Sequence, residues 1–383
     1  MIDASRKLFA TRRTFLKTAA SSAALGSWAG RAWGSPAGSS TQNDSERAIT
    51  ELYRSLTPQQ RSEVCFDWDF RVNIRYGRTP LWQPDPQGIL LRTHVSNAWH
   101  ITPRLIGSEF YTDQQRELIL DVLRATMAAD WVAKLQQQAR EDSGVAWGGD
   151  QAIAIFGQPG SEACQCVITG FHLTIRATTE PKARAAFGGP ISHGHQPSGF
   201  YERLNHPGNF FWKQSLLANE VYKLFDGAQQ RQALVTANIP WFKYQDDLLQ
   251  VDRTLIVPET PWEVPRHEQD IRFRRQGDAT LGLSVAQFTR EQRTALDAVL
   301  ASLVEPYRQE YQDQVFDCIQ QQGGLEVCSL AFYQERDMGN DRIWDNWRLE
   351  GPALTWFFRG SPHVHLWIHV ARDPQAPITS YFG

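Results

Sequence analysis

Residues 353–370 read Ala-Leu-Thr-Trp-Phe-Phe-Arg-Gly-Ser-Pro-His-Val-His-Leu-Trp-Ile-His-Val, two apolar runs separated by the turn residues 359–362. Side chains of a strand alternate between its two faces. The second run therefore has a continuous apolar face, formed by Val364, Leu366, Ile368 and Val370. Its other face carries His363, His365, Trp367 and His369. This pattern predicts a hairpin of an antiparallel sheet, with one buried face and one face lined by imidazoles.

Further strands and helices are expected on the N-terminal side of this hairpin. Gln151–Phe156 and Cys164–Thr178 are strand-like runs. Threonine capping boxes predict helix starts at Thr57, Thr112 and Thr289. With helical periodicity, these starts predict helices over Ser45–Leu56, from Thr57, over Thr112–Ala139, Asn209–Phe225 and Thr289–Gln321.

The order of these elements defines the expected fold class. Residues 187–208 and 237–288 are rich in Gly, Pro and aromatic residues, and they are predicted to be long ordered loops. Helices that flank hairpin strands, without strict strand–helix alternation, favour an α+β fold. We expect an antiparallel sheet with long flanking helices and long Gly/Pro/aromatic-rich loops.

The first 34 residues have the pattern of an export leader. Residues 11–18 read Thr-Arg-Arg-Thr-Phe-Leu-Lys-Thr, and the pair Arg12-Arg13 in this setting resembles the twin-arginine signal of bacteria. A short apolar segment and small residues within 32–38 follow, as cleavage requires. The resemblance implies transport by the twin-arginine machinery to the periplasm or the exterior. We expect a signal peptide at 1–34, a disordered tether at 35–44 and a single domain at 45–383.

The charge of the mature chain argues against a nucleic-acid partner. The leader holds six of the 39 Lys and Arg residues and one of the 42 Asp and Glu residues, so residues 35–383 carry a net charge of −8. Such a body has no basic patch for nucleic acid or anionic lipid. No segment is long and apolar enough to span a bilayer. The 14 Trp and 20 Phe residues supply a core and pockets for a small-molecule ligand or substrate.

Three histidines from two segments form the main candidate metal site. His172 falls on the polar side of the predicted strand Cys164–Thr178, and it meets His363 and His365 if the two strands are neighbours. In the same register, Cys164 and Cys166 fall on that polar side too. Neutral imidazoles bind zinc, copper or iron. The alternative is a solvated face on which hydrogen-bonded structural histidines happen to fall.

Other polar groups are weaker candidates. His193 and His195 belong to a His-Gly-His in a glycine-rich segment, and His369 lies further along the hairpin. Carboxylates among aromatic residues can perform acid–base chemistry, and the candidates of this type are Asp246, Glu259 and Glu263. Loop carboxylates are also commonly solvated. The sequence has no His-Glu-x-x-His, no Gly-x-Ser-x-Gly elbow and no phosphate-binding loop.

The blocks Asn97-Ala-Trp-His100, Gly170-Phe-His172-Leu and His363-Val-His365 occur in an order that resembles the DUF3500 family. The resemblance runs from about residue 50 to residue 376, and members of that family are typically bacterial and often exported. It implies that His172 matches the second histidine of a Gly-His-His-Leu block, and that His363 and His365 match a closing His-x-His. The chain departs at Phe171, where the family usually has the first histidine, and at Pro362, where it usually has Asn. No activity is established for the family as a class.

Three functions are compatible with these patterns. The first is an exported metal-binding enzyme, a hydrolase or an oxidoreductase, with zinc, copper or iron on His172, His363 and His365. The second is a metal-free hydrolase that uses the carboxylates named above. The third is a non-catalytic periplasmic protein that holds a ligand between aromatic loops.

Overall fold

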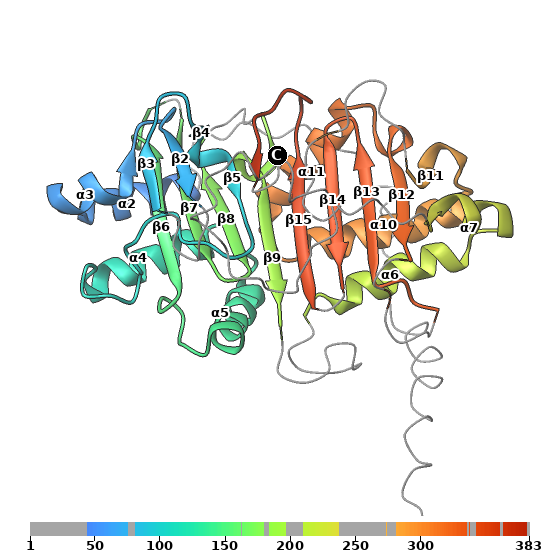
Figure 1. Cartoon of the computed structure of the whole chain (residues 1–383), viewed down its shortest axis with the longest axis horizontal. Helices are drawn as coiled ribbons and strands as arrows, with labels where there is room; N and C mark the ends of the chain where they lie inside the picture. Colours follow the sequence, from blue (N-terminus) through green and yellow to red (C-terminus); the bar gives the residue numbers. More distant parts are fainter. Residues whose placement is uncertain are drawn as a thin grey trace, which may run out of the picture. The chain divides into compact units, whose positions relative to one another are not determined.

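The computed structural model describes residues 44–75, 81–161, 163–179, 184–196, 210–236, 273, 281–334, 337, 342–360 and 363–380. The predicted leader with Arg12 and Arg13 lies outside these residues, and so does nearly all of the predicted tether. The carboxylates Asp246, Glu259 and Glu263 lie outside them too. Figure 1 shows the described elements, which consist of a broad sheet and helices packed on it.

The described part of the chain contains eight α-helices, several of which begin where the capping boxes predict. Thr57, Thr112 and Thr289 each cap a helix with reciprocal bonds to a glutamine three residues on. The helices are α2 (Asp44–Ser55), α3 (Pro58–Val64), α4 (Asp113–Arg124), α5 (Ala129–Ser143), α6 (Trp212–Lys223), α7 (Gly227–Ala233), α10 (Arg290–Val304) and α11 (Gln309–Gln321). The short 3-10 turns are η3 (Leu91–Thr93), η4 (Ala186–Gly188), η7 (Val285–Gln287) and η8 (Leu325–Val327).

Eleven of the described strands form one sheet. Its order is β1 (Cys65–Phe66), β6 (Gln151–Gly157), β7 (Cys164–Gly170), β8 (Leu173–Thr178), β9 (Ile191–His195), β15 (Val364–Val370), β14 (Leu354–Arg359), β13 (Asn346–Gly351), β12 (Ser329–Tyr333) and β10 (Leu234–Val235), with β11 (Leu283–Ser284) also on β12. Two small sheets pair β2 (Arg71–Arg75) with β3 (Leu81–Pro84) and β4 (Ile89–Leu90), and β5 (His94–Val95) with β16 (Thr379–Ser380).

The α+β class is confirmed, and the predicted hairpin is β14 and β15. The large sheet is antiparallel except at two outer positions, where β1 runs parallel to β6 and β10 runs parallel to β12. Each of these two-residue strands directly follows a short helix and pairs near the C-terminal end of its neighbour, with Phe66 opposite Phe156 and Val235 opposite Tyr333. The sheet is therefore mixed rather than wholly antiparallel.

The two long predicted helices are each a pair of helices. The expected Thr112–Ala139 is interrupted between α4 and α5, and the expected Thr289–Gln321 is interrupted between α10 and α11. At the breaks, Ala128 N–H donates to the Pro306 carbonyl and Arg308 N–H donates to the Thr126 carbonyl, at 2.9 and 3.0 Å. Pro306 has no N–H and cannot donate the next helical hydrogen bond at the end of α10. These two hydrogen bonds therefore join the pair α4–α5 to the pair α10–α11.

The two halves of the described chain repeat the same order of elements. In the first half, α2, α3 and β1 precede the pair α4–α5 and the strands β6 to β9. In the second half, α6, α7 and β10 precede the pair α10–α11 and the strands β12 to β15. β9 and β15 pair at the centre of the sheet and join the halves.

The strand predicted over Cys164–Thr178 is a hairpin. The chain reverses at Phe171 and His172, so that Gly170 pairs with Leu173. This reversal overturns the register assumed for the cysteines, because Cys166 now lies opposite Ala177 in the core beneath the helices. All five cysteines are free, and Cys164 and Cys166 point away from the polar side of the sheet.

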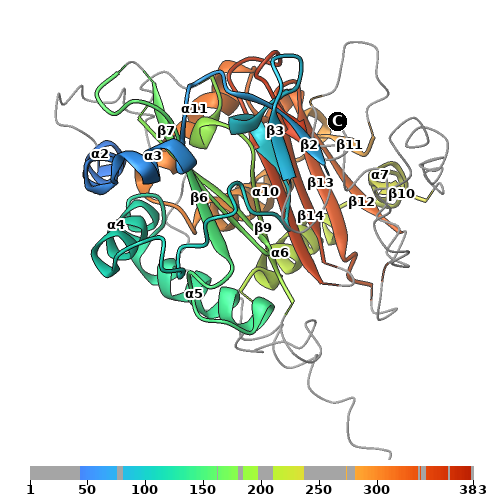
Figure 2. The same ribbon diagram turned by 60° about the vertical axis from the view of Figure 1, so that its left-hand side comes forward.

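Both faces of the sheet are covered. The helices bury one face, which includes Val364, Leu366 and Ile368 of β15 as predicted. On the other face, Trp99 and Ile101 pack on β6 and β7 in a second cluster. Figure 2 shows α4 and α5 on one side of the sheet and β2 and β3 on the other. The imidazole-bearing face of β15 is therefore buried rather than solvated.

Candidate metal centre

Three imidazoles converge at the junction of the two halves. His363 and His365 come from the start of β15, and His172 comes from the turn between β7 and β8. One nitrogen from each ring can be chosen so that all three atoms lie within 4.8 Å of one another. The ring centroids of His172 are 4.9 Å from those of both His363 and His365. The structure thus brings together the residues that the sequence proposed as one set.

His172 adopts a backbone conformation that few side chains tolerate. Its φ is +58°, in the left-handed region, and its side chain is 1% exposed. The strands on either side close the turn, and the His172 N–H donates to the Asn97 carbonyl. Such a conformation costs on the order of 1 kcal/mol or more and is common at functional sites. The turn aims a buried imidazole at β15.

Gly194 provides the space that the His172 ring occupies. It lies on β9 directly opposite His365 of β15. A Cβ placed on Gly194 would come within 3.0 Å of Cγ and Cδ2 of His172 and 2.7 Å from the Val364 carbonyl oxygen. The glycine of the His-Gly-His motif is therefore the member that makes room for the cluster. Residues 191–195, predicted as part of a loop, form β9.

Asp142, near the end of α5, fixes the orientation of His172. Its Oδ2 lies 2.8 Å from Nδ1 of His172, and its Oδ1 accepts hydrogen bonds from Nδ1 of His195 and the Gln196 N–H at 3.1 and 2.7 Å. The Asp142 side chain is fully buried. Burial raises the pKa of this carboxyl, but the hydrogen bonds from His172 and His195 outweigh it and hold the pKa well below its usual value.

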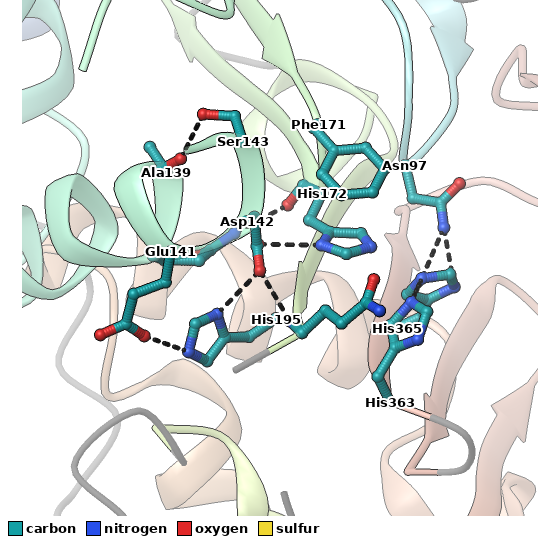
Figure 3. Close-up of polar contacts among 12 residues, drawn as sticks. Asn97, Ala139, Glu141, Asp142, Ser143, Phe171, His172, His195, His363 and His365 are labelled. Carbon is teal, nitrogen blue, oxygen red and sulfur yellow. Dashed lines mark hydrogen bonds and ion pairs between the residues drawn. The ribbon is translucent and has the colours of Figure 1, made fainter. Parts of the chain in front are cut away.

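This carboxylate determines which nitrogen of His172 is available. Because the ionised Asp142 accepts a hydrogen bond, Nδ1 of His172 carries the proton and Nε2 presents its lone pair. His195, which shares Asp142, also lies 3.0 Å from Oε2 of Glu141 (Figure 3). The chain Glu141–His195–Asp142–His172 leads from a partly exposed carboxylate to the cluster.

Burial favours the neutral form of all three imidazoles. Burial, with the charge of Arg359 as the next cause, lowers the pKa of His363 to about 3 and the pKa of His365 well below its usual value. Burial also lowers the pKa of His172, although Asp142 opposes this effect. Neutral imidazole is the form that binds a metal ion.

The separations of the nitrogens suit a cation. Nε2 of His363 and Nε2 of His365 lie 2.7 Å apart, so either a proton or a cation must lie between their lone pairs. In a tetrahedral site, bonds of ~2.1 Å place ligand nitrogens ~3.4 Å apart, so the 2.7 Å pair must open by ~0.7 Å and the widest pair must close by up to ~1.4 Å. Side-chain rotation supplies such a shift. The residues present therefore fit an ion held by three imidazoles.

Two further side chains contact the cluster. Nδ2 of Asn97 lies 2.7 Å from Nδ1 and 2.9 Å from Nε2 of His365. Nη2 of Arg359, which lies opposite His365 in β14, is 3.4 Å from Nε2 of His363. Both position the imidazoles of β15.

A cavity of about 140 Å³ lies beside the cluster. Its walls include Asp142 and Phe171, and the Phe171 ring stacks on His172 with centroids 4.0 Å apart. A second polar pair lines it, since Nε2 of His100 is 3.0 Å from Oδ1 of Asp150. The cavity thus reaches two residues that contact His172 directly.

The weaker histidine candidates lie outside the cluster. His193 points to the helix side and bonds Tyr307 at 2.7 Å. His195 contacts the cluster only through Asp142. His369 lies four residues beyond His365, ~13 Å along the strand, and stacks on Phe273.

The second half of the fold has no such cluster at the matching position. Its turn, Gly351-Pro352-Ala353-Leu354, has Ala353 where the first half has His172, and Gly351 pairs with Leu354 in the same way. Gln322 at the end of α11 takes the place of Asp142 and bonds the backbone of Ala353 at 2.8 and 2.9 Å. The fold therefore forms this turn without a histidine–aspartate pair.

Sequence reasoning missed Asp142, Arg359 and the role of Gly194. Asp142 is thirty residues from His172 and lies beyond the expected end of its helix, so no local spacing links the two. Asn97 belongs to the family-like block Asn97-Ala-Trp-His100, but its sequence context gave it no role. A glycine between two histidines of a strand was the one available signal for Gly194.

Comparison with known proteins places the chain in a class defined by sequence. The family profile described as "Protein of unknown function (DUF3500)" matches residues 38–375. The chain belongs to this DUF3500 family, as its blocks indicated. No curated protein and no solved structure matches the chain. Among the described residues, no helix combines the length and apolarity needed to cross a membrane.

Proposed function

We propose that this protein is a metal-binding enzyme whose ion is held by His172, His363 and His365. The observation that carries the proposal is the convergence within 4.8 Å of two buried imidazoles and one half-buried imidazole, with His172 oriented by a buried carboxylate. The second half of the fold supports a functional role for His172, because Ala353 and Gln322 stabilise the equivalent turn there. A histidine at the position of His172 is therefore no requirement of the turn itself.

The donor set favours zinc over the other two candidate ions. Three imidazoles with an open position are the ligand set of one class of catalytic zinc sites, and such an ion lowers the pKa of bound water to ≈ 7. Copper sites with thiolate ligands are disfavoured, because the cysteines next to β8 point into the opposite core. The iron triad of two histidines and a carboxylate is disfavoured, because Asp142 bonds to a ring nitrogen of His172. The proposal is thus a zinc-dependent hydrolase on a small-molecule substrate.

The protein groups have separate tasks in this proposal. Asp142 keeps the proton on Nδ1 of His172, which leaves Nε2 as donor. Asn97 restrains the ring of His365. The burial of His172, His365 and the Asp142 side chain strengthens their electrostatic contacts. Phe171 places an aromatic wall between His172 and the neighbouring cavity.

Metal content of purified variants tests the proposal. After zinc loading and dialysis, we expect about one zinc ion per chain in the wild type, measured by inductively coupled plasma mass spectrometry. His363→Gln and His172→Asn should retain less than about a tenth of that. His100→Gln is the matched control, since its imidazole bonds Asp150 outside the cluster and its loss should leave zinc content unchanged. Equal zinc in all four proteins would contradict the proposal.

We also propose export through the twin-arginine machinery to the periplasm or exterior of a bacterial cell. The support is the sequence around Arg12-Arg13. A fusion of residues 1–44 to a reporter protein should reach the periplasm, and Arg12→Lys with Arg13→Lys should hold the reporter in the cytoplasm. Export of the double variant at the wild-type level would refute this.

A further inference from the structure

The cavity next to the metal cluster is bordered by a further histidine, His100. Its described walls come from residues 98–100, Asp150, Phe171 and the end of α5, and they enclose about 140 Å³. A cavity of about 150 Å³ in another protein holds one benzene molecule, so this space admits a ligand of about six non-hydrogen atoms. The three imidazoles of the metal cluster are not among these walls. The cavity is therefore a separate place from the metal centre.

His100 has one ring nitrogen that is available to a ligand. Its Nε2 lies 3.0 Å from Oδ1 and 3.1 Å from the backbone oxygen of Asp150. A carboxylate and a carbonyl only accept hydrogen bonds, so Nε2 carries the proton and Nδ1 of the neutral ring presents its lone pair. Within the described part of the chain, Nδ1 has no hydrogen-bond partner, although the side chain is only 14% exposed. His100 therefore offers the cavity a hydrogen-bond acceptor.

The carboxylates of the walls determine which charge a ligand can carry. Although burial raises the pKa of Asp142, hydrogen bonds from His172 and His195 hold it well below its usual value, so the group is ionised. The second carboxylate, Asp150, accepts a hydrogen bond from the Phe171 N–H at 3.0 Å. None of the described wall residues is a lysine or an arginine. These walls therefore stabilise a cation and repel an anion.

We propose that this cavity binds a small molecule through a protonated primary amine. One N–H of the ammonium group donates to Nδ1 of His100, and the negative charges of Asp142 and Asp150 stabilise its positive charge. Trp99 and Phe171 suit such a ligand, because aromatic rings attract cations. A carbon body of about five atoms fills the remaining volume. This inference does not require the proposed metal ion.

The test is a titration of the full-length protein, labelled with nitrogen-15 at its histidines and followed by NMR. Cyclopentylammonium is the probe, cyclopentanol is its neutral counterpart, and cyclobutanecarboxylate is its anionic counterpart. We expect the ammonium probe to bind saturably, with a Kd on the order of 1 mM, and to shift the Nδ1 resonance of His100. The alcohol should bind about 10-fold more weakly, because its donor is uncharged. Equal or tighter binding of the alcohol or the carboxylate overturns the proposal.

Two variants remove the binding site in different ways. In His100→Gln the amide can still donate to Asp150, but the acceptor Nδ1 is gone, so the affinity for the ammonium probe should fall about 10-fold. Ala98→Leu keeps His100 and fills the cavity, so it should abolish saturable binding, and it decides the matter if the glutamine variant does not fold. Ser143→Ala is the matched control, because the Ser143 hydroxyl donates to the Ala139 carbonyl at 2.5 Å. Wild-type affinity in either His100→Gln or Ala98→Leu overturns the proposal.

Amines also bind metal ions, so the titration is repeated with zinc-loaded protein, with zinc-free protein and with His363→Gln. We expect the same affinity for the ammonium probe in all three. An amine that binds only the zinc-loaded protein binds the ion and not the cavity, which overturns this inference and leaves the metal site standing. A wild-type protein that binds the amine but no zinc refutes only the metal site.

Discussion

Gly194 lies under the imidazole of His172, in a position where any Cβ would come within 3.0 Å of two ring carbons. The glycine also faces His365 across the central strand pair. The ring that reaches over from the β7–β8 turn therefore fills the space of a missing side chain. This relationship ties the two halves of the fold to one site.

Gly194→Ala should displace the His172 ring and lower metal affinity. The methyl group would approach the Val364 carbonyl oxygen to 2.7 Å as well, so we also expect a loss of stability of about 1–3 kcal/mol. Chelator competition and urea unfolding measure the two effects. Gly227→Ala is the control, because the nearest atom to its Cβ is 3.5 Å away. Wild-type metal affinity in Gly194→Ala would show that the ring does not need this space.

Asp142→Asn should weaken metal binding about 10- to 100-fold, the usual cost of losing the carboxylate behind a ligand histidine. The amide no longer holds the proton on Nδ1 of His172, so Nε2 is no longer reliably unprotonated. Chelator competition measures the affinity. Glu141→Gln is the matched neighbour, since Glu141 contacts only His195 in this group of residues. An equal change in both variants would argue for a general effect of lost negative charge.

Substitutions at His172 should separate ligation from backbone strain. Its φ of +58° is tolerated better by asparagine than by alanine. His172→Asn and His172→Ala should both lose the metal, and the asparagine variant should unfold at the higher temperature. Thermal unfolding in the presence of a chelator gives the comparison. A less stable asparagine variant would mean that the turn relaxes without the ring.

Buried neutral histidines should make the metal-free protein sensitive to acid. Burial lowers the pKa of His193 to about 3 from an ordinary value of 6.5. A lowered folded-state pKa means that only the unfolded chain takes up the proton between these values. The contribution of neutral His193 to the free energy of unfolding is therefore complete above pH 6.5. It is lost as pH falls towards 3, at about 1.4 kcal/mol per pH unit.

His193→Gln removes the titrating group. The glutamine amide can still bond to the Tyr307 hydroxyl, which lies 2.7 Å from Nε2 of His193 in the wild type. Urea unfolding at several values between pH 4.5 and 7.5 should give the variant a shallower loss of stability than the wild type. Parallel curves would show that His193 takes up its proton in the folded protein.

The strongly periodic parts of the sequence predicted the fold best. Alternation in residues 364–370 identified β15 and its buried face, and the threonine caps located three helices. The errors arose where a short segment changes direction. The predicted helix Thr289–Gln321 ran through Pro306, although a proline is a signal for a break, and the matching break at Ala128 carries no proline. The two central residues of the reversal, Phe171 and His172, are neither glycine nor proline, so the run appeared to be one strand.

The site could be predicted only in part. The polar positions of two strands suggested that His172, His363 and His365 meet, and they do. Asp142, Asn97 and Arg359 act through contacts between segments far apart in the chain, which no local pattern encodes. β9 went unrecognised because Gly194 weakens the strand signal, and the same glycine is what the cluster requires.

X-ray absorption spectroscopy of the zinc-loaded protein identifies the ligands of the ion. We expect a shell of nitrogen or oxygen at ~2.0–2.1 Å with the multiple-scattering signature of three imidazoles. His363→Gln with His365→Gln should reduce that signature to one imidazole or abolish binding. A sulfur shell at ~2.3 Å, or a spectrum without imidazole scattering, would contradict the proposed metal site.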